Sequence, residues 1–488
     1  MTNSLATTTP GKSPMTRLSE SVQRAASALV DGDLSQDQNV ASLLAETSGR
    51  RHMDLSDLAP QEQAHLVAGR SVDVIPSEDA LRTTIEEARA TGRQLIVKLG
   101  IDPTSADVHL GHAVPMILLS RFQRMGHHVV FIVGDMTAKI GDPSGRSDER
   151  PKLTDEDIAE NLRTYRDQVS PFFDFDRASF RKNSEWLSEI KLPGLLEILS
   201  RIPVSMPLQR EDFRTRLAEG HGLALSEFIY SVVMALDSVE IKADIELGGV
   251  DQLLNLQMGR KVMEVAGQKP ELVVTLPLIE GTDGTGAKMS KSKGNYIALN
   301  ATPEDIFGKV MSIPDRLMVP YLRAWTEWTD AEIEVATDRV EARTLHPMDL
   351  KKVLAGEAVG AIHGLDAAMK ARSEFTAQFS KRSFGDVDSL PTVDMAKDGT
   401  LAVGSVLCQV LSFTESNGAA RRMAQGNGLR LVVESGQNSE QIKLGQETIQ
   451  RPLAEVVEES LVGVISANAD DAQVYLKAGR KIARLESL

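Results

Sequence analysis

The chain has 488 residues, of which 42% are hydrophobic, 25% charged and 4% aromatic, so it is long enough for about two to four domains with sizeable cores. No run approaches the ~18 apolar residues of a membrane span, the polar start lacks a secretory layout, and the single cysteine excludes an internal disulfide and a metal site built from cysteines. The net charge of −15 argues against indiscriminate coating of nucleic acid. We therefore expect a cytoplasmic protein that uses no membrane.

The first segment, residues 1–55, is rich in Ser, Thr, Asp, Gln and Ala and is predicted to be a poorly ordered extension. Helical periodicity begins near Asp54 with a short helix (DLAPQEQAHLVAG). A second helix (PSEDALRTTIEEARATG) is predicted to begin at Ser77, with acidic residues in its first turn.

A β-loop-α-β unit follows these helices. It consists of a strand over 95–99, the loop GIDPTSADVHLGH, a helix (AVPMILLSRFQRMG) and a buried strand (VVFIVGD). Such a unit predicts an α/β fold with a doubly wound parallel sheet, which binds its ligands at the carboxyl ends of the strands.

The remaining chain continues this pattern and then changes character. Residues 150–240 are predicted to be mostly helical, strands follow at 244–247 and in ELVVTLPLI, and a glycine-rich loop, EGTDGTGAKMSKSKGN, comes next. Residues 302–385 are predicted to be helical. The last 90 or so residues show short β-prone runs (LRLVVES, GVISAN, AQVYLK) after a basic helix around Arg421 and Arg422.

The first candidate site is the pair His109 and His112 in the sequence HLGH, where the loop enters the helix. Amides and the dipole at a helix start favour a phosphate, and two imidazoles three residues apart project toward one ligand. Taken alone, such a pair is more typical of helix capping or of zinc binding than of a phosphate site.

The second candidate site is the run KMSKS at residues 288–292, flanked by glycines. Two ammonium groups three residues apart on a flexible loop can move onto a polyphosphate and neutralise the charge that develops there. A lysine-rich loop is usually only solvated. HLGH after the first parallel strand and KMSKS after the last strand of the same sheet form a far more specific combination.

With these two motifs the chain resembles the class I aminoacyl-tRNA synthetases, and within them the bacterial tyrosyl-tRNA synthetases. The stretches GIDPTSADVHLGH, KIGDPSGRSDER, ELGGVDQLLNLQMGR and GAKMSKSKGNY match that family in order and spacing. The resemblance covers residues 56–395 well and the last 90 weakly. It implies that tyrosine is activated with ATP to tyrosyl-adenylate and pyrophosphate and then transferred to the 3′ end of tRNA.

The resemblance also implies residue roles around ATP, with Mg²⁺ as the counter-ion of the phosphates. The implied catalytic residues around the phosphates are Thr104, His109, His112, Lys288, Lys291, Arg146 and Arg150. The implied ATP-binding residues are Gly100, Asp102, Gly111, Gly248, Gly249, Asp251, Met289, Ser290 and Ser292. Two alternatives stay open here: Arg146 and Arg150 as solvated loop cations, and Asp251 as the N-cap of the next helix.

The amino-acid pocket is implied by the helix SEFIYSVVMALDSVEI. Its residues Tyr230, Met234 and Asp237 lie on one stripe of the helix, where a carboxylate needs a partner. In the family this Asp accepts the hydrogen bond of the substrate phenol, and the Tyr contacts the substrate ammonium. The implied amino-acid-binding residues are Asp142, Tyr230, Met234, Asp237, Gln252 and Lys98.

Two of these residues depart from the usual pattern. Met234 stands where many members place a Gln, and Lys98 where many place a Tyr, although some bacterial members carry a Lys there. Alternative functions are therefore a paralogue that activates a tyrosine analogue or serves as an inhibitor-resistant copy, and a non-catalytic RNA-binding or regulatory homologue.

The resemblance divides the chain into four parts. Residues 1–55 form the extension and 56–301 a Rossmann-like catalytic domain with a helical dimerisation insert near 190–235. Residues 302–395 form a helical domain on the anticodon side, and 396–488 a small α+β domain that resembles a degraded S4-type RNA-binding module. The expected partners are tRNA, tyrosine, ATP and a second copy of the chain.

Overall fold

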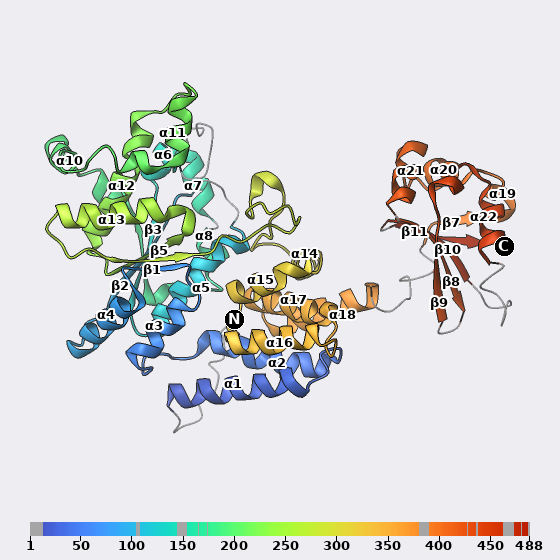
Figure 1. The fold of residues 1–488 in the computed structure, drawn as a ribbon, viewed down its shortest axis with the longest axis horizontal. Coiled ribbons are helices and arrows are strands. Elements are labelled where there is room, and N and C mark those ends of the chain that lie inside the picture. Colours follow the sequence, from blue (N-terminus) through green and yellow to red (C-terminus); the bar gives the residue numbers. More distant parts are fainter. Residues whose placement is uncertain are drawn as a thin grey trace. The chain divides into compact units, whose positions relative to one another are not determined.

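The computed structural model describes residues 13–103, 108–143, 154–163, 165–172, 174–379, 390–426, 428–435, 438–461, 473–479 and 481–486. The chain forms two compact units, Met1–Ser373 and Glu374–Leu488, which we describe separately (Figure 1). Within the described residues, no helix is both long and apolar enough to cross a membrane.

The core of the first unit is a six-stranded sheet in the order β1-β6-β5-β2-β3-β4. Its strands are β1 (Asp73–Ile75), β2 (Ile96–Ile101), β3 (His128–Val133), β4 (Ala178–Lys182), β5 (Ile245–Gly249) and β6 (Leu272–Leu276). All neighbours are parallel except the edge pair β1 and β6. Two of these strands, β1 and β4, were not predicted, because both are short and only half-buried at the sheet edges.

Chain order and sheet order together locate the crevice of this sheet. From β2 the chain proceeds to β3 and β4 on one side and then to β5 and β6 on the other. The topological switch point therefore lies where β2 adjoins β5, the place where open α/β sheets bind ligands. This arrangement confirms the predicted doubly wound parallel sheet.

Helices cover the sheet and extend beyond it (Figure 1). Those between the N-terminal segment and β6 are α3 (Pro60–Ala68), α4 (Glu78–Ala90), α5 (Leu110–Arg124), α6 (Thr137–Ile140), α7 (Asp155–Arg163), α8 (Tyr165–Val169), α9 (Ser184–Leu187), α10 (Leu192–Leu199), α11 (Glu211–Ala218), α12 (Leu225–Ile241) and α13 (Leu253–Val265). The helices that follow the glycine-rich loop are α14 (Pro303–Met311), α15 (Met318–Trp325), α16 (Asp330–Glu341), α17 (Pro347–His363) and α18 (Leu365–Phe379).

The N-terminal extension differs from its prediction, because the structure places most of it in two helices, α1 (Pro14–Asp31) and α2 (Asp37–Gly49). The Ser13 hydroxyl caps α1 by accepting from the Thr16 amide, and Gly32 ends it. Widely spaced apolar residues such as Leu29 and Leu43 are fully buried. Low overall hydrophobicity therefore concealed a narrow apolar stripe that packs against the helices after residue 302.

A buried ion pair holds this extension in place. Both terminal nitrogens of Arg50 bind the carboxylate of Glu332, at 2.7 and 2.8 Å, and both side chains are almost fully buried. The same carboxylate accepts from the Thr329 amide at the start of α16. The pair thus joins the end of the extension to a helix cap nearly 300 residues later.

Arg50→Leu is expected to lower the free energy of unfolding by about 3–5 kcal/mol, because it leaves a buried carboxylate without its counter-ion. The matched control is Arg24→Leu, which removes the exposed Arg24–Glu46 pair between α1 and α2 and should cost less than about 1 kcal/mol. Urea unfolding followed by circular dichroism measures both. Equal losses for the two variants would contradict a special role for the buried pair.

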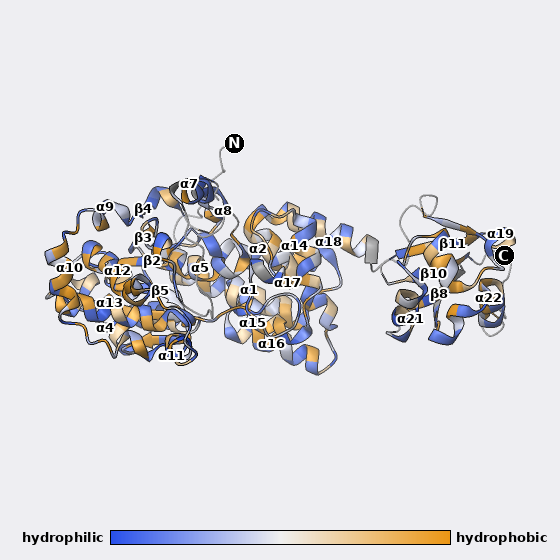
Figure 2. Cartoon of the chain, turned by 90° about the horizontal axis from the view of Figure 1, so that it is seen from above, coloured by the Kyte–Doolittle hydropathy of each residue, from blue (hydrophilic) through white to orange (hydrophobic). Residues whose placement is uncertain are grey.

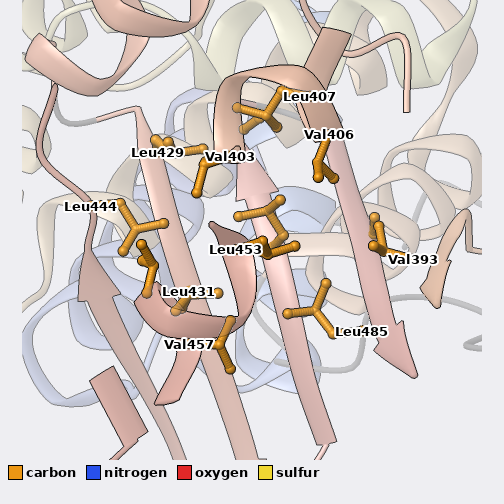
Figure 3. Packing of buried hydrophobic residues seen from close by; sticks show 14 of the residues in the cluster. Val393, Val403, Val406, Leu407, Leu429, Leu431, Leu444, Leu453, Val457 and Leu485 are labelled. Carbon is orange, nitrogen blue, oxygen red and sulfur yellow. The ribbon is translucent and has the colours of Figure 1, made fainter. Parts of the chain in front are cut away.

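The second unit contains a five-stranded sheet in the order β7-β11-β10-β8-β9. Its strands are β7 (Thr392–Asp394), β8 (Leu429–Ser435), β9 (Asn438–Lys443), β10 (Gln473–Ala478) and β11 (Lys481–Glu486), and its helices are α19 (Met395–Asp398), α20 (Val403–Ser405), α21 (Asn417–Gln425) and α22 (Leu453–Leu461). Figure 3 shows its apolar core, where Val403, Leu431, Leu453 and Leu485 meet between sheet and helices. The predicted run GVISAN lies outside the described residues.

Candidate functional site

The predicted site residues gather at the carboxyl ends of β2, β3, β5 and β6, beside the switch point. The HLGH motif follows β2, Asp142 follows β3, GGVDQ spans the end of β5, and KMSKS lies in the loop after β6. Parallel strands bring these sequence-distant loops to one edge of the sheet.

The two histidines of HLGH lie at the start of α5. Their rings stack with centroids 3.8 Å apart, and the His109 amide donates to Nδ1 of His112 at 3.4 Å. Burial and neighbouring positive charges lower the pKa of His109 to about 3 and of His112 to about 4. Both imidazoles are therefore neutral at pH 7 and can donate hydrogen bonds to phosphate without carrying charge. His109 and His112 also cap the start of α5, which was one of the open alternatives, and this capping does not prevent them from binding phosphate.

The KMSKS loop forms a hairpin that is bound back to the sheet. The backbones of Glu280 and Lys288 pair as an isolated antiparallel β-bridge, and the Met289 amide donates to the Ile279 carbonyl at 2.7 Å. Asn295 closes the other side, where its side-chain oxygen accepts from the Ser290 amide at 2.9 Å. Met289 is buried, whereas Lys291, in the short turn Lys291–Lys293 that contains Ser292, is exposed.

Two contacts join this loop to the other motifs. The chain just beyond it pairs with HLGH, through a bridge between His109 and Ala298 and a hydrogen bond from the Leu110 amide to the Ile297 carbonyl. Lys288 Nζ lies 3.0 Å from Asp251 Oδ2. The structure thus brings the first and second candidate sites together.

The GGVDQ segment forms a narrow turn at the end of β5. A methyl group on Gly249 would lie 2.6 Å from an Asp251 carboxylate oxygen, so a larger residue would displace that side chain. Gln252 donates to Asp142 at 2.9 Å, and Asn255 on α13 contacts both residues. Asp142 and Gln252, both predicted to bind the amino acid, are therefore direct neighbours.

A chain of hydrogen bonds connects the ends of the predicted amino-acid pocket. Tyr230 donates to Asp102 at 2.9 Å, and Thr137 donates to the other oxygen of Asp102 at 2.6 Å. Asn183 donates to Thr137 at 3.1 Å and lies 3.5 Å from Asp237. The sequence placed Asp102 beside the nucleotide, and the structure also couples it to Tyr230.

Asp237 lies at the far end of this chain and is 3% exposed. Trp186 Nε1 donates to one of its oxygens at 2.9 Å. Burial raises the pKa of Asp237 to about 7, although Lys98 and the two hydrogen bonds lower it. This carboxyl can therefore change between an acceptor and a donor near neutral pH. Met234, one turn earlier on α12, is half-buried.

For six further predicted residues the structure gives either no description or only the element in which they lie. Thr104, Arg146 and Arg150 lie outside the described residues. Gly100 is at the end of β2, Gly111 in the first turn of α5, and Gly248 within β5.

Sequence reasoning missed five polar residues beneath the site: Thr137, Asn183, Trp186, Glu246 and Glu271. Thr137, Asn183 and Trp186 extend the hydrogen-bond chain between Asp102 and Asp237. Glu246 binds Lys98, which the resemblance had placed among the amino-acid-binding residues, at 2.8 Å. Trp186 is one of only three tryptophans in the sequence, and this rarity could have indicated a buried hydrogen-bond donor. The other four missed residues look like ordinary strand or loop residues in the sequence.

Comparison with known proteins identifies the family. The model of the tRNA synthetases class I (W and Y) matches residues 90–380. A tyrosine–tRNA ligase of Thermotoga maritima is 41% identical over 390 residues, covering 80% of this chain and 94% of that protein. A tyrosine–tRNA ligase of Thiobacillus denitrificans is 43% identical over 357 residues, covering 72% of this chain and 89% of that protein. Among solved structures, a truncated mitochondrial tyrosyl-tRNA synthetase of Aspergillus nidulans has a TM-score of 0.54 at 21% identity, covering 70% of this chain and 99% of that one. The chain belongs to the tyrosyl-tRNA synthetases of bacterial type, within class I.

Proposed function

We propose that the protein activates tyrosine with ATP to tyrosyl-adenylate and pyrophosphate, and then transfers tyrosine to the 3′ end of tRNA. The observation that supports this most directly is the joint presence of two sites at one sheet edge. One is the neutral histidine pair beside the KMSKS loop, and the other is the buried carboxyl of Asp237 at the end of a polar chain that starts at Tyr230. The first suits a polyphosphate and the second suits a phenol.

Amino-acid activation is an in-line attack of a carboxylate on the α-phosphorus, so positioning and charge neutralisation are the main catalytic contributions. His109 and His112 would donate hydrogen bonds to the phosphates as neutral rings. Lys288 and Lys291 would neutralise the leaving pyrophosphate. Lys288 Nζ lies 3.0 Å from Asp251 Oδ2, so the group proposed for the phosphates and the group proposed for the ribose are direct neighbours.

The reaction is tested by amino-acid-dependent exchange of pyrophosphate into ATP, with tyrosine, phenylalanine and tryptophan compared side by side. We expect strong exchange with tyrosine and almost none with phenylalanine. The absence of exchange with tyrosine would contradict the proposal. Exchange with a tyrosine analogue alone would instead favour the paralogue with an altered pocket, to which Met234 points.

Further properties of the family extend this proposal. Mg²⁺ would accompany ATP as the counter-ion of its phosphates; among the described residues, no three His, Cys, Asp or Glu side chains cluster to hold a metal by themselves. The helices after residue 302 and the second unit would contact tRNA, and the reaction would take place in the cytoplasm.

We also propose a homodimer that covers the insert at 190–235. Helix α10 has no buried residue although it is strongly apolar (Figure 2), and Leu192 and Leu196 are 66% and 54% exposed. Val204 and Leu225, which belong to the same insert, are exposed as well. An apolar surface of this kind is typical of a subunit contact.

Leu196→Glu is expected to convert the protein to a monomer at micromolar concentration, because the change places a charge on the proposed contact. Met348→Glu, at an apolar residue exposed elsewhere on α17, is the matched control and should leave the assembly unchanged. Sedimentation velocity distinguishes the species. A wild-type protein that is already monomeric would disprove the dimer.

A further inference from the structure

Three charged side chains lie buried in the sheet behind Asp237. Lys98 on β2 and Glu246 on β5 are register partners, and Lys98 Nζ lies 2.8 Å from Glu246 Oε1. Glu271, which directly precedes β6, is the third. All three are 1% exposed. No role in binding ATP or transferring tyrosine uses the two glutamates.

The two glutamates approach one another at Gly259 of α13. A methyl group on this glycine would clash with Glu271 Oε1 and would lie 3.1 Å from Glu246 Oε2, so both oxygens converge on the same point. Among the described residues, the Ser238 hydroxyl lies close to Glu271, but neither carboxyl oxygen of Glu271 has a hydrogen bond of good geometry. Two buried carboxylates so placed, with the Lys98 ammonium bound to Glu246, strongly disfavour the ionisation of both. Burial and the Glu246 carboxylate accordingly raise the pKa of Glu271 well above its ordinary range.

The same charges act on Asp237. Burial lowers the pKa of the Lys98 ammonium, but Glu246, Glu271 and Asp237 raise it by more, so Lys98 stays charged. Helix α12 connects the two groups, because Ser238, next to Asp237, donates to Glu246 Oε2 at 3.4 Å. The other groups that face Asp237 are Trp186 and Asn183, which are uncharged.

The position of the Lys98 ammonium therefore decides what Asp237 can do. While Lys98 is bound to Glu246, the Asp237 carboxylate keeps capacity to accept a further hydrogen bond. Asp237 is the third carboxylate whose charge acts on Lys98, so it would remain as the counter-ion if Glu246 and Glu271 lost their charge. An ion pair there would compete with the hydroxyl group of the substrate.

We propose that Glu246 and Glu271 share one proton and together hold the Lys98 ammonium away from Asp237, which keeps Asp237 available to read the substrate phenol. Glu246 and Glu271 are thus positioning residues that set specificity through Lys98. The proton sharing stands on the structure alone, and only the link to the phenol rests on the proposed function.

Infrared spectroscopy tests the shared proton without any substrate. At pH 8.5, where ordinary carboxyl groups are ionised, wild-type protein should show the carbonyl-stretch band of a buried neutral carboxylic acid. Labelling with ¹³C-glutamate should shift this band, which assigns it to Glu and excludes Asp237. Glu246→Gln and Glu271→Gln should each abolish it, because the remaining glutamate then carries the single negative charge. A wild-type spectrum without the band would overturn the proposal.

Kinetics of pyrophosphate exchange test the link to specificity. Each single variant retains one carboxylate for Lys98 and should raise KM for tyrosine by at most about threefold, whereas Glu246→Gln/Glu271→Gln should raise it by more than about 30-fold, beyond the product of the singles. KM for ATP should change by less than about twofold in all of them. Glu264→Gln, at an exposed glutamate on the same helix as Gly259, is the control. The link would be overturned if the double variant raised KM for tyrosine only by the product of the two single effects, or if it raised KM for tyrosine and KM for ATP alike. Failure of the wild-type protein to use tyrosine would instead refute the proposed function.

Discussion

Lys291→Ala is expected to lower kcat for tyrosine activation by about 10²–10³, the usual cost of removing one group that stabilises transition-state charge. Lys291 lies on the exposed turn of the KMSKS loop, close enough to the histidine pair for its charge to help lower the pKa of His109. Because its charge matters mainly when pyrophosphate departs, KM for tyrosine should stay within about threefold of its wild-type value. Pre-steady-state formation of tyrosyl-adenylate measures the step directly.

The same turn supplies a matched control. Lys293 is also exposed and belongs to the same short turn, so Lys293→Ala removes one positive charge from the loop without removing the proposed catalytic one. We expect its kcat to fall by less than about threefold. Equal losses at both positions would mean that the loop acts through its overall charge, and normal activity of Lys291→Ala would remove it from the mechanism.

Asp237→Asn is expected to lower kcat/KM for tyrosine by about 10², because a buried hydrogen bond to a charged group, worth about 3 kcal/mol, is lost. The value for phenylalanine should hardly change, since phenylalanine has no hydroxyl to pair. A tyrosyl-tRNA synthetase can reject phenylalanine by about 10⁵, and a ratio of that size would fall here to about 10³. Exchange assays with both amino acids measure the ratio, and an unchanged ratio would show that another group reads the hydroxyl.

Asp237 also predicts a pH dependence. Its pKa is raised to about 7, so the carboxylate that accepts the phenol hydrogen bond is lost as pH falls through 7. In the wild-type protein kcat/KM for tyrosine should therefore decrease about tenfold per pH unit below that value and level off above it. Asp237→Asn should abolish this dependence. His109 and His112, with pKa values of about 3 and 4, do not titrate in the same window.

Much of the catalytic sheet was predictable from sequence, because its central strands are apolar runs buried on both faces. The strand predicted at 95–99 is β2, and the one predicted at 244–247 is β5, each within two residues at either end. The motifs were predictable for a different reason: HLGH and KMSKS occur in the order and spacing of a known family, and their roles were implied by that resemblance. The half-buried edge strands lacked any such pattern.

The polar groups beneath the pocket could not be predicted in the same way. Glu246 alternates with apolar residues in β5 as a solvent-facing residue would, and only the alignment of β5 beside β2 shows that it faces Lys98. Glu271 and Asn183 stand outside regular elements, where nothing in the local sequence indicates burial. Their function depends on long-range pairing, which is a property of the folded chain and not of any window of sequence.

The helical extension has a practical consequence for anyone who trims this protein. The family model begins at residue 90, so a shortened version cut to that match would look complete on sequence grounds. It would nevertheless strip Val40, Leu43 and Leu44 from the helices after residue 302, including the contact of Leu44 with Gly356. Poor solubility of such a fragment would result from the loss of these contacts and would say nothing about the catalytic site. Inhibitor screens or tRNA-charging assays should therefore use the chain with its N-terminal helices.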